Sequence, residues 1–299
     1  MASFRRIFPY LLAVLVLAAV GWAVSFGTLP PADFTFINGT EVQSIDPAIV
    51  TGVPEGRIIN GIFEGLYRPM PDPEEPTNLR PTPAIAESCD ISEDGKTYTF
   101  HIRESARWSN GEPITADDFA WSWMRFLHPE VPNQYAYQLH YIVGARKYNY
   151  GTKELETGDR VEIELADREK DEQLFPRGTM LAGILKGIEK PPEPELDDDA
   201  SEDDRKEAEA AWKKRWVFEI DVKPAMDGDV SWDAPGKVQR FCKDEDVDAT
   251  TCKHVLYHFG EVGIRAPDKQ TLVVDLNDPT PYFLHLAAFY PCYPVNRRC

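Results

Sequence analysis

Positive charge is scarce in this chain of 299 residues. Lysine and arginine together number 32 against 50 aspartate and glutamate residues, so the formal net charge is -18 at pH 7. Nucleic acids and anionic membrane surfaces attract basic protein faces, so this balance argues against either as a partner. Hydrophobic residues still make up 42% of the chain and aromatic residues 11%. That content is ample for a globular core, so we expect a folded acidic protein.

The motifs of common enzymes are also lacking. The sequence contains no Gly-x-Ser-x-Gly nucleophile elbow, no Gly-x-x-x-x-Gly-Lys phosphate loop and no His-Glu-x-x-His zinc motif. The one cluster with metal-like spacing is Cys252-x-His254-x-x-x-His258. Its two histidines would share a face on a helix and also on a strand, so the spacing does not decide the matter. Surface or packing histidines are the simpler interpretation, and we predict no catalysis, no cofactor and no metal.

A long apolar run stands at the N-terminus. Arg5 and Arg6 form a basic start, and Leu11 to Val20 is uninterrupted apolar sequence. The run is intermediate between a signal-peptide core and the roughly 20 residues of a membrane-spanning helix. We therefore predict that residues 1–26 are a signal peptide or an N-terminal membrane anchor. The chain is then expected in the periplasm or on the extracytoplasmic face of the cytoplasmic membrane.

Cysteine is sparse and odd in number for an exported chain. The five cysteines are Cys89, Cys242, Cys252, Cys292 and Cys299. Cys242 and Cys252 are close enough in sequence to form a small disulfide loop in an oxidising compartment. Free buried thiols are the alternative, because cysteine also packs as a small apolar residue.

The densest local signals lie between Lys96 and Trp123. After the turn Asp94-Gly95, the residues Tyr98, Phe100 and Ile102 alternate with polar neighbours, which predicts a half-buried strand. A second turn follows at Asn110-Gly111. Thr115 and Asp118 then form a capping-box pattern that predicts the start of a helix. Pro129 is expected to end that helix.

The run from Asp94 to Asp118, DGKTYTFHIRESARWSNGEPITADD, resembles the signature of the bacterial extracellular solute-binding proteins of family 5. These are the oligopeptide- and dipeptide-binding receptors of ABC importers. Further blocks keep the order of the family: NGTEVQSIDP from residue 38, GVPE from 52, IFEGLYRP from 62, PAIAES from 83 and GIRAPDKQTLVVDLNDPTPYF from 263. The resemblance covers Phe34 to Tyr150 and Val262 to Val295.

The resemblance implies an α/β, periplasmic-binding-protein-like (type II) fold with two lobes, here truncated to the first lobe and part of its base. It implies an extracytoplasmic substrate-binding component that captures oligopeptides and delivers them to a membrane permease. The implied partners are short peptides and ABC transporter permease subunits. A monomer is expected, with membrane contact only through an uncleaved N-terminal segment.

Four residues are implied as peptide-binding by the resemblance. Thr51, Gly52 and Val53 match the loop whose backbone pairs with peptide in oligopeptide receptors, and Tyr135 matches a tyrosine that faces the cleft. Glycine at position 52 suits a close approach of backbone to ligand. A plain turn glycine and a packing tyrosine are the alternatives at these positions.

Residues 151–236 depart from the family pattern and are predicted to be an acidic insertion. The segment contains an alternating strand at Val161 to Leu165, the acidic run Lys190 to Asp204, a helix at Arg205 to Arg215 and a second alternating strand at Trp216 to Val222. We expect some folded structure around a solvated acidic loop. Residues 32–150 and 237–299 are then the parts of the solute-binding lobe.

A second hypothesis belongs to a different class. An envelope-anchored interaction or sensor protein could reuse the solute-binding fold, with the acidic insertion as its docking surface. Retention of the N-terminal segment and failure to bind peptides would favour this hypothesis.

Overall fold

The computed structural model describes residues 14–22, 35–165, 180–196, 200–223 and 236–298. The chain divides into two compact units, Met1–Glu41 and Val42–Cys299. In the first unit, residues 14–22 are helical and expose apolar side chains such as Leu17 and Trp22. The described helices include none with the length and apolar character needed to cross a membrane. The rest of the predicted segment 1–26 lies outside the described residues.

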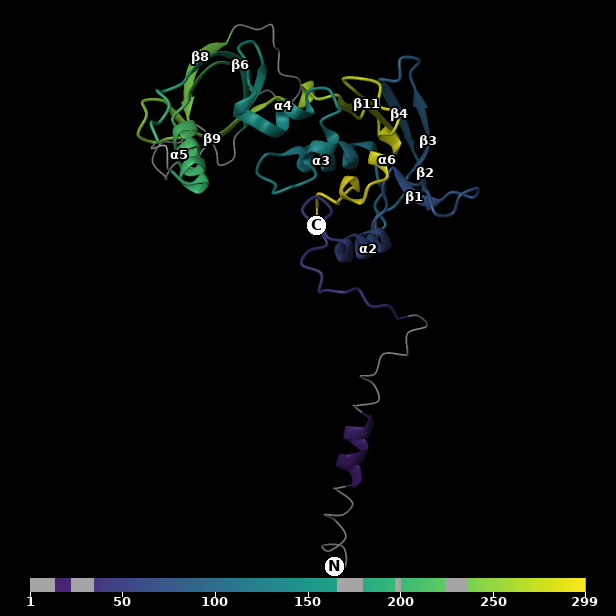
Figure 1. Ribbon diagram of the computed structural model, residues 1–299. Coiled ribbons are helices and arrows are strands. Elements are labelled where there is room, and N and C mark those ends of the chain that lie inside the picture. Colours follow the sequence, from purple (N-terminus) through teal and green to yellow (C-terminus); the bar gives the residue numbers. More distant parts are fainter. Residues whose placement is uncertain (1–13, 23–34, 166–179, 197–199, 224–235, 299) are drawn as a thin grey trace, which may run out of the picture. The chain divides into compact units, whose positions relative to one another are not determined.

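The second unit contains two groups of strands and their helices (Figure 1). The first group belongs to a mixed α/β region that is labelled α2, β1–β4, α3, α4, β11 and α6 in Figure 1. Its longer elements are α2 (Val53–Ile62), β1 (Tyr67–Pro71), β2 (Leu79–Pro83), β3 (Ala86–Ile91), β4 (Thr97–Ile102), α3 (Ala116–Leu127), α4 (Ala145–Tyr150), β11 (Thr271–Asp275) and α6 (Phe283–Ala287). The short elements are η1 (Ala136–Leu139), η2 (Gly151–Lys153), η3 (Phe259–Glu261), β10 (Ile264–Arg265) and η4 (Tyr290–Cys292).

A four-stranded antiparallel sheet in the order β10-β11-β4-β3 carries the core of this region. The alternation that predicted β4 is confirmed, since Tyr98, Phe100 and Ile102 are buried and the residues between them are partly exposed. Phe100 pairs with Cys89 on β3 and Leu272 on β11. The sheet therefore joins segments that lie far apart in the sequence, and it buries one face of β4 completely.

Helix α3 covers the buried face of this sheet. The predicted capping box is confirmed, because the Thr115 backbone N–H donates to the Asp118 carboxylate at 2.8 Å and the reciprocal bond is also made. The helix ends at Leu127, just before Pro129. Trp123 is buried against Phe283 with nearly perpendicular rings, and its indole N–H donates to the Cys292 carbonyl at 2.9 Å. Helix α3 thus ties the C-terminal part of the chain to the sheet.

The Pro-rich segment from Pro69 to Pro83 contains two paired strands. Strands β1 and β2 pair as a separate antiparallel two-stranded sheet, with Tyr67 opposite Pro83. Proline cannot donate to a ladder, which usually argues against a strand, yet it is tolerated at edges. Both strands of a two-stranded sheet are edges, so the prolines leave enough bonds for pairing.

The second group of strands closes into a barrel in the order β5-β6-β7-β8-β9. Its strands are β5 (Arg160–Leu165), β6 (Met180–Glu189), β7 (Val217–Lys223), β8 (Lys237–Cys242) and β9 (Thr250–Tyr257). The barrel has its own apolar core, which includes Val161, Phe218 and Phe241. The predicted strands at Val161 to Leu165 and Trp216 to Val222 correspond to β5 and β7. The folded unit, however, continues past residue 236, because β8 and β9 complete the barrel.

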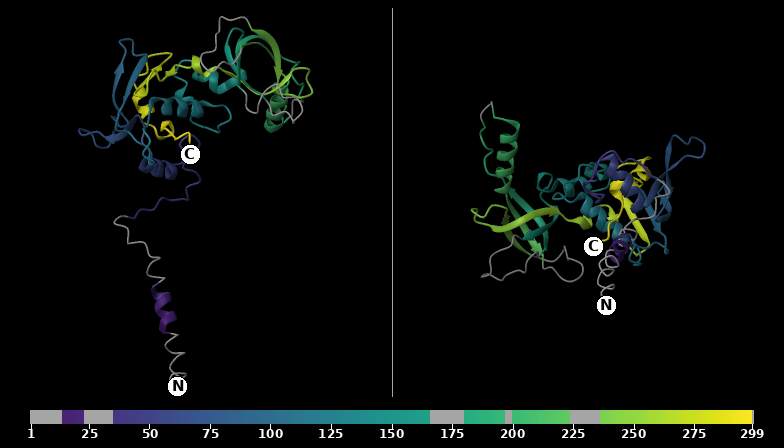
Figure 2. Two further views of the ribbon diagram at one scale, coloured as in Figure 1. Left: turned by 180° about the vertical axis from the view of Figure 1, so that it is seen from behind. Right: turned by 90° about the horizontal axis from the view of Figure 1, so that it is seen from below.

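Helix α5 (Glu202–Lys214) accompanies the barrel and is drawn in green with it in Figure 2. The predicted helix at Arg205 to Arg215 begins earlier than expected, because Ser201 and Asp204 form a capping box. None of its residues is buried. The indole N–H of Trp212 donates to the Pro191 carbonyl at 2.8 Å, which ties the C-terminal end of the helix to the segment after β6.

The possible disulfide between Cys242 and Cys252 is not formed. Both thiols are free and buried. Cys292 is also a free, buried thiol, and Cys89 is a free thiol that is partly buried. Cys242 donates to the Lys214 carbonyl at 3.2 Å instead. The alternative of free thiols is therefore the correct one for the cysteines that the structure describes.

Candidate functional site

Two of the predicted site residues are in direct contact. The hydroxyl of Tyr135 donates a hydrogen bond to the carbonyl oxygen of Thr51 at 3.3 Å. Thr51 is exposed and Tyr135 is half-buried, so the contact lies at the surface of this chain. The structure therefore brings together residues that are 84 positions apart in the sequence.

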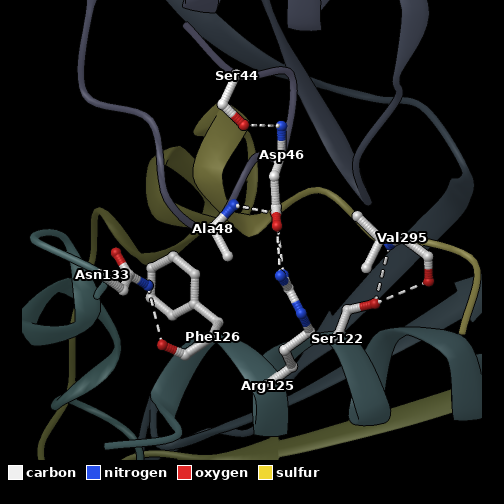
Figure 3. A network of polar contacts seen from close by, with 8 residues as sticks. All are labelled: Ser44, Asp46, Ala48, Ser122, Arg125, Phe126, Asn133 and Val295. Atoms are coloured by element: carbon white, nitrogen blue, oxygen red, sulfur yellow. Dashed lines mark hydrogen bonds and ion pairs between the residues drawn. The ribbon is translucent and has the colours of Figure 1, made fainter. Parts of the chain in front are cut away.

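Tyr135 is positioned by the C-terminal end of α3. The Asn133 side-chain amide donates to the carbonyl oxygen of Phe126 at 2.9 Å, and its side-chain oxygen accepts from the Tyr135 backbone N–H at 2.8 Å. Figure 3 shows Asn133 reaching the end of the helix. Asparagine satisfies two backbone groups here, one at the helix terminus and one in the following loop. The start of the η1 turn, and with it Tyr135, is thus fixed to α3.

The loop that carries Thr51 is also fixed to α3, through an ion pair. The two terminal guanidinium nitrogens of Arg125, Nη1 and Nη2, each donate to one carboxylate oxygen of Asp46, with Nη1 at 2.9 Å from Oδ1 (Figure 3). Asp46 Oδ1 also accepts from the Ala48 backbone N–H at 3.1 Å, and the Asp46 N–H donates to Ser44 at 3.1 Å. A bidentate arginine–carboxylate pair fixes orientation as well as distance. One helix therefore sets the positions of both contact partners.

Gly52 and Val53 stand at the start of α2. Gly52 is the N-cap residue with an extended backbone, at φ -82° and ψ 150°, and Val53 is the first helical residue. The resemblance assigns Val53 to a loop, whereas in the structure Val53 is the first residue of α2. No backbone N–H from Thr51 to Val53 has a hydrogen-bond partner among the described residues. Unpaired N–H groups are normal at a helix start. Here they belong to residues that are exposed or partly exposed.

Gly52 also makes room for a carboxylate. An added Cβ at position 52 would lie 1.9 Å from Oε2 of Glu55, so the side chain of Glu55 occupies the space that any larger residue would need. Glu55 is buried and accepts from the Gln43 backbone N–H at 3.3 Å. A larger residue at position 52 would therefore force the Glu55 carboxylate, the end of a flexible side chain, to move.

Three aromatic residues pack against one another beside the loop: Tyr135, Phe289 and Tyr290. The rings of Tyr135 and Phe289 are nearly perpendicular with centroids 5.1 Å apart, and those of Phe289 and Tyr290 are 5.0 Å apart. Burial, the proximity of Tyr135 and a hydrogen bond with it raise the pKa of Tyr290 to about 12. Sequence reasoning missed Phe289 and Tyr290. They lie more than 150 positions after Tyr135, and no local pattern links them to it.

The metal-like cluster does not converge on one site. His254 is buried on β9 with Nε2 2.5 Å from Glu164, whereas the His258 side chain accepts from the Gly260 N–H after the strand. In the part of the chain that the structure describes, no group of three or more histidine, cysteine or acidic residues could hold a metal ion.

The chain is similar to several known peptide-binding proteins. It is 43% identical over 117 residues to the oligopeptide-binding protein OppA of Bacillus subtilis, covering 39% of this chain and 20% of that protein. It is 45% identical over 104 residues to the periplasmic oligopeptide-binding protein OppA of Escherichia coli, covering 35% of this chain and 18% of that protein. The dipeptide-binding protein DppE of Bacillus subtilis is 42% identical over 114 residues, covering 38% of this chain and 20% of that protein.

Solved structures give matches of similar kind. A substrate-binding domain of an oligopeptide ABC transporter from Bacillus anthracis matches with a TM-score of 0.46 and 24% identity, covering 85% of this chain and 28% of that chain. Haemophilus influenzae OppA in complex with RPPGFSPFR matches with a TM-score of 0.46 and 20% identity, covering 87% of this chain and 30% of that chain.

The model of the bacterial extracellular solute-binding proteins, family 5 Middle, matches residues 80–297. This match spans well over half of the chain, so the chain belongs to that family. The predicted α/β, periplasmic-binding-protein-like fold class is thereby confirmed. The chain spans about a fifth of the length of the curated relatives that it matches.

Proposed function

We propose that this chain is part of the extracytoplasmic substrate-binding component of an ABC peptide importer, which captures oligopeptides and delivers them to a permease without chemical conversion. The observation that carries the proposal is the hydrogen bond from Tyr135 to Thr51. It joins the two segments that were expected to contact peptide. Relatives whose names state oligopeptide and dipeptide binding support the same substrate class.

The geometry suits recognition through the peptide backbone. Thr51 and Gly52 offer unpaired N–H groups, and the backbone of Gly52 is extended, so an extended peptide can add here as a strand. Main-chain pairing of this kind ignores the side chains of the ligand. Tyr135 and Phe289 then supply flat apolar faces beside the loop, against which varied ligand side chains can pack.

The direct test is peptide binding by the purified chain. Short peptides of mixed sequence are titrated by calorimetry, and peptides retained through purification are identified by mass spectrometry. The proposal predicts binding that is weakened by Tyr135→Phe and unchanged by Tyr137→Phe, because Tyr137 is an exposed tyrosine of the same segment with no bond to the loop. Equal effects of the two substitutions, or no peptide bound at all, would contradict it.

The second candidate function is the envelope-anchored interaction or sensor protein. The barrel favours it, since β5 to β9 form a folded unit and the attached helix α5 leaves every residue unburied. A protein that docks through this unit would lose its partner when the barrel surface is changed, and would not respond to peptides. A peptide-induced change in stability that is abolished by Tyr135→Phe would reject this candidate.

A further inference from the structure

His254 stands between two carboxylates that belong to different parts of the second unit. Its Nε2 is 2.5 Å from Glu164 on β5, and its Nδ1 is 3.2 Å from Glu130 in the loop after α3. Only 3% of its side chain is exposed. The imidazole therefore bridges the barrel and the loop that follows α3 in a position from which bulk water is nearly excluded.

The two carboxylates cannot both accept a hydrogen bond from a neutral imidazole. Neutral imidazole carries one N–H donor, so it can donate to one carboxylate and must turn a lone pair toward the other. Imidazolium has a donor on each nitrogen and satisfies both carboxylates. We propose that His254 is a pH-sensitive latch: its charged form ties the barrel to the loop after α3, and loss of its proton releases one of the two ties.

Other charged groups face the same site. Lys253 Nζ lies 3.2 Å from Glu130 and 3.5 Å from Glu164, so it holds the carboxylates together from the solvent side. The ring of His128 stands 5.6 Å from that of His254, centroid to centroid, and its Nδ1 accepts from the Glu130 N–H at 3.3 Å. Two carboxylates thus face one lysine and a pair of histidines.

The surroundings of His254 also set the pKa values of His128 and Glu130. Burial, followed by repulsion from a charged His254, lowers the pKa of His128 below the ordinary value. Burial raises the pKa of Glu130, but the hydrogen bond from Lys253 and the charge of His254 outweigh it and leave that pKa below its ordinary value. The site therefore disfavours a proton on His128. Loss of the His254 proton would weaken the latch, and a proton on His128 would weaken it by repulsion from the charged His254 beside it.

Hydrogen exchange on the full chain tests the latch. Exchange of the amides in residues 128–133 and 252–257 is compared at about pH 6.5 and about pH 8.5 after correction for intrinsic rates, a range chosen because histidine titrates within it. The latch predicts roughly twofold to fivefold faster opening of these segments at the higher pH, the effect of losing one ion-pair contact to a half-exposed carboxylate. Segments of β4 and β11 serve as the reference and should not change.

Two variants distinguish the latch from a general effect of pH. His254→Gln and Glu130→Gln each remove one partner and should open these segments at both pH values, leaving no step between them. Glu130 is half-exposed, so Glu130→Gln should fold even if the change at buried His254 does not. His285→Gln is the control, because His285 is exposed on α6. A pH step that survives in Glu130→Gln, or no step in the unaltered chain, would overturn the proposal.

Discussion

The hydroxyl of Tyr135 bonds to the carbonyl oxygen of Thr51 at 3.3 Å, and both residues are held in place by the same helix. Asn133 fixes the segment of Tyr135 to the C-terminal end of α3, and Arg125 fixes the turn before Thr51 through Asp46. Because one rigid element carries both supports, the spacing of the two segments is set before any ligand arrives. Preorganisation of this kind reduces the entropy that binding must offset.

Replacing Tyr135 by phenylalanine tests the contact itself. The ring is kept, and the hydrogen bonds of the hydroxyl to Thr51 and with Tyr290 are lost, at a cost of about 0.5–1.5 kcal/mol for each neutral bond. Both partners belong to the chain, so this cost falls on the free energy of unfolding and should lower the midpoint of thermal unfolding modestly. Peptide affinity, measured by calorimetry, should fall as well, because the loop is then held less firmly before binding. Tyr137→Phe is the matched control. A large loss of stability with unchanged affinity would assign Tyr135 to packing instead.

Replacing Arg125 by alanine tests the support of the loop. The side chains of Arg125 and Asp46 are 27% and 25% exposed, so their bonds are only partly screened by solvent. Loss of a charged, bidentate pair should cost about 1–3 kcal/mol in the free energy of unfolding, measured with urea. Arg68→Ala breaks an exposed pair with Glu64 and should cost less than about 0.5 kcal/mol. Similar costs for the two variants would show that the Asp46 turn is not held by Arg125.

Gly52→Ala and Gly61→Ala should change different properties, although both residues belong to the region of α2. The first should change peptide affinity and the second the free energy of unfolding. At position 52 the added Cβ would overlap the Glu55 carboxylate, which must then move and weaken its bond with the Gln43 N–H. The loop is then held less firmly, and peptide affinity should fall. At position 61, within the helix, a Cβ meets nothing within 4 Å. Gly61→Ala should therefore raise stability by about 0.5–1 kcal/mol through helix propensity. Calorimetric titration and urea unfolding of both variants check the contrast, and unchanged affinity in Gly52→Ala would remove the loop from the site.

The elements that sequence reasoning predicted correctly are those with strong local signals. The alternation in β4 and the capping box of Thr115 and Asp118 depend only on neighbouring residues, so both could be predicted without tertiary information. The β1–β2 hairpin was missed because its prolines argue locally against a strand. Closure of the barrel was missed because β8 pairs in parallel with β9 over only two residue pairs, and nothing local specifies that pairing.

The site was predictable to a similar degree. Thr51, Gly52, Val53 and Tyr135 were suggested by resemblance to the family, and the structure places Thr51 and Tyr135 in contact. Their supports were not predictable, because Asp46 and Arg125 are 79 residues apart and become partners only through the packing of α3. An aspartate in a turn and an arginine on a helix are each ordinary surface residues when considered alone.

The two capping boxes differ in what they stabilise. Thr115→Ala removes the cap of α3, which is packed in the core, and should lower the free energy of unfolding by about 1 kcal/mol. Ser201→Ala removes the cap of α5, which has no buried residue, so it should fray that helix without changing global stability. Urea unfolding measures the first effect and hydrogen exchange of residues 202–208 the second. A global loss with Ser201→Ala would mean that α5 supports the barrel after all.

The buried thiols should be chemically inert in the folded chain. Burial raises the pKa of Cys252 and that of Cys292 to about 12, so at pH 8 only about one molecule in ten thousand carries the reactive thiolate at either position. We expect iodoacetamide to alkylate both residues at least about 100-fold more slowly in buffer than in urea, followed by peptide mass spectrometry. Alkylation of the folded chain at the rate seen in urea would show that these thiols are exposed. A reductant should leave the unfolding midpoint unchanged, because Cys242 and Cys252 are free thiols. A midpoint that falls on reduction, together with a Cys242–Cys252 peptide lacking two hydrogens, would show instead that the protein closes this loop.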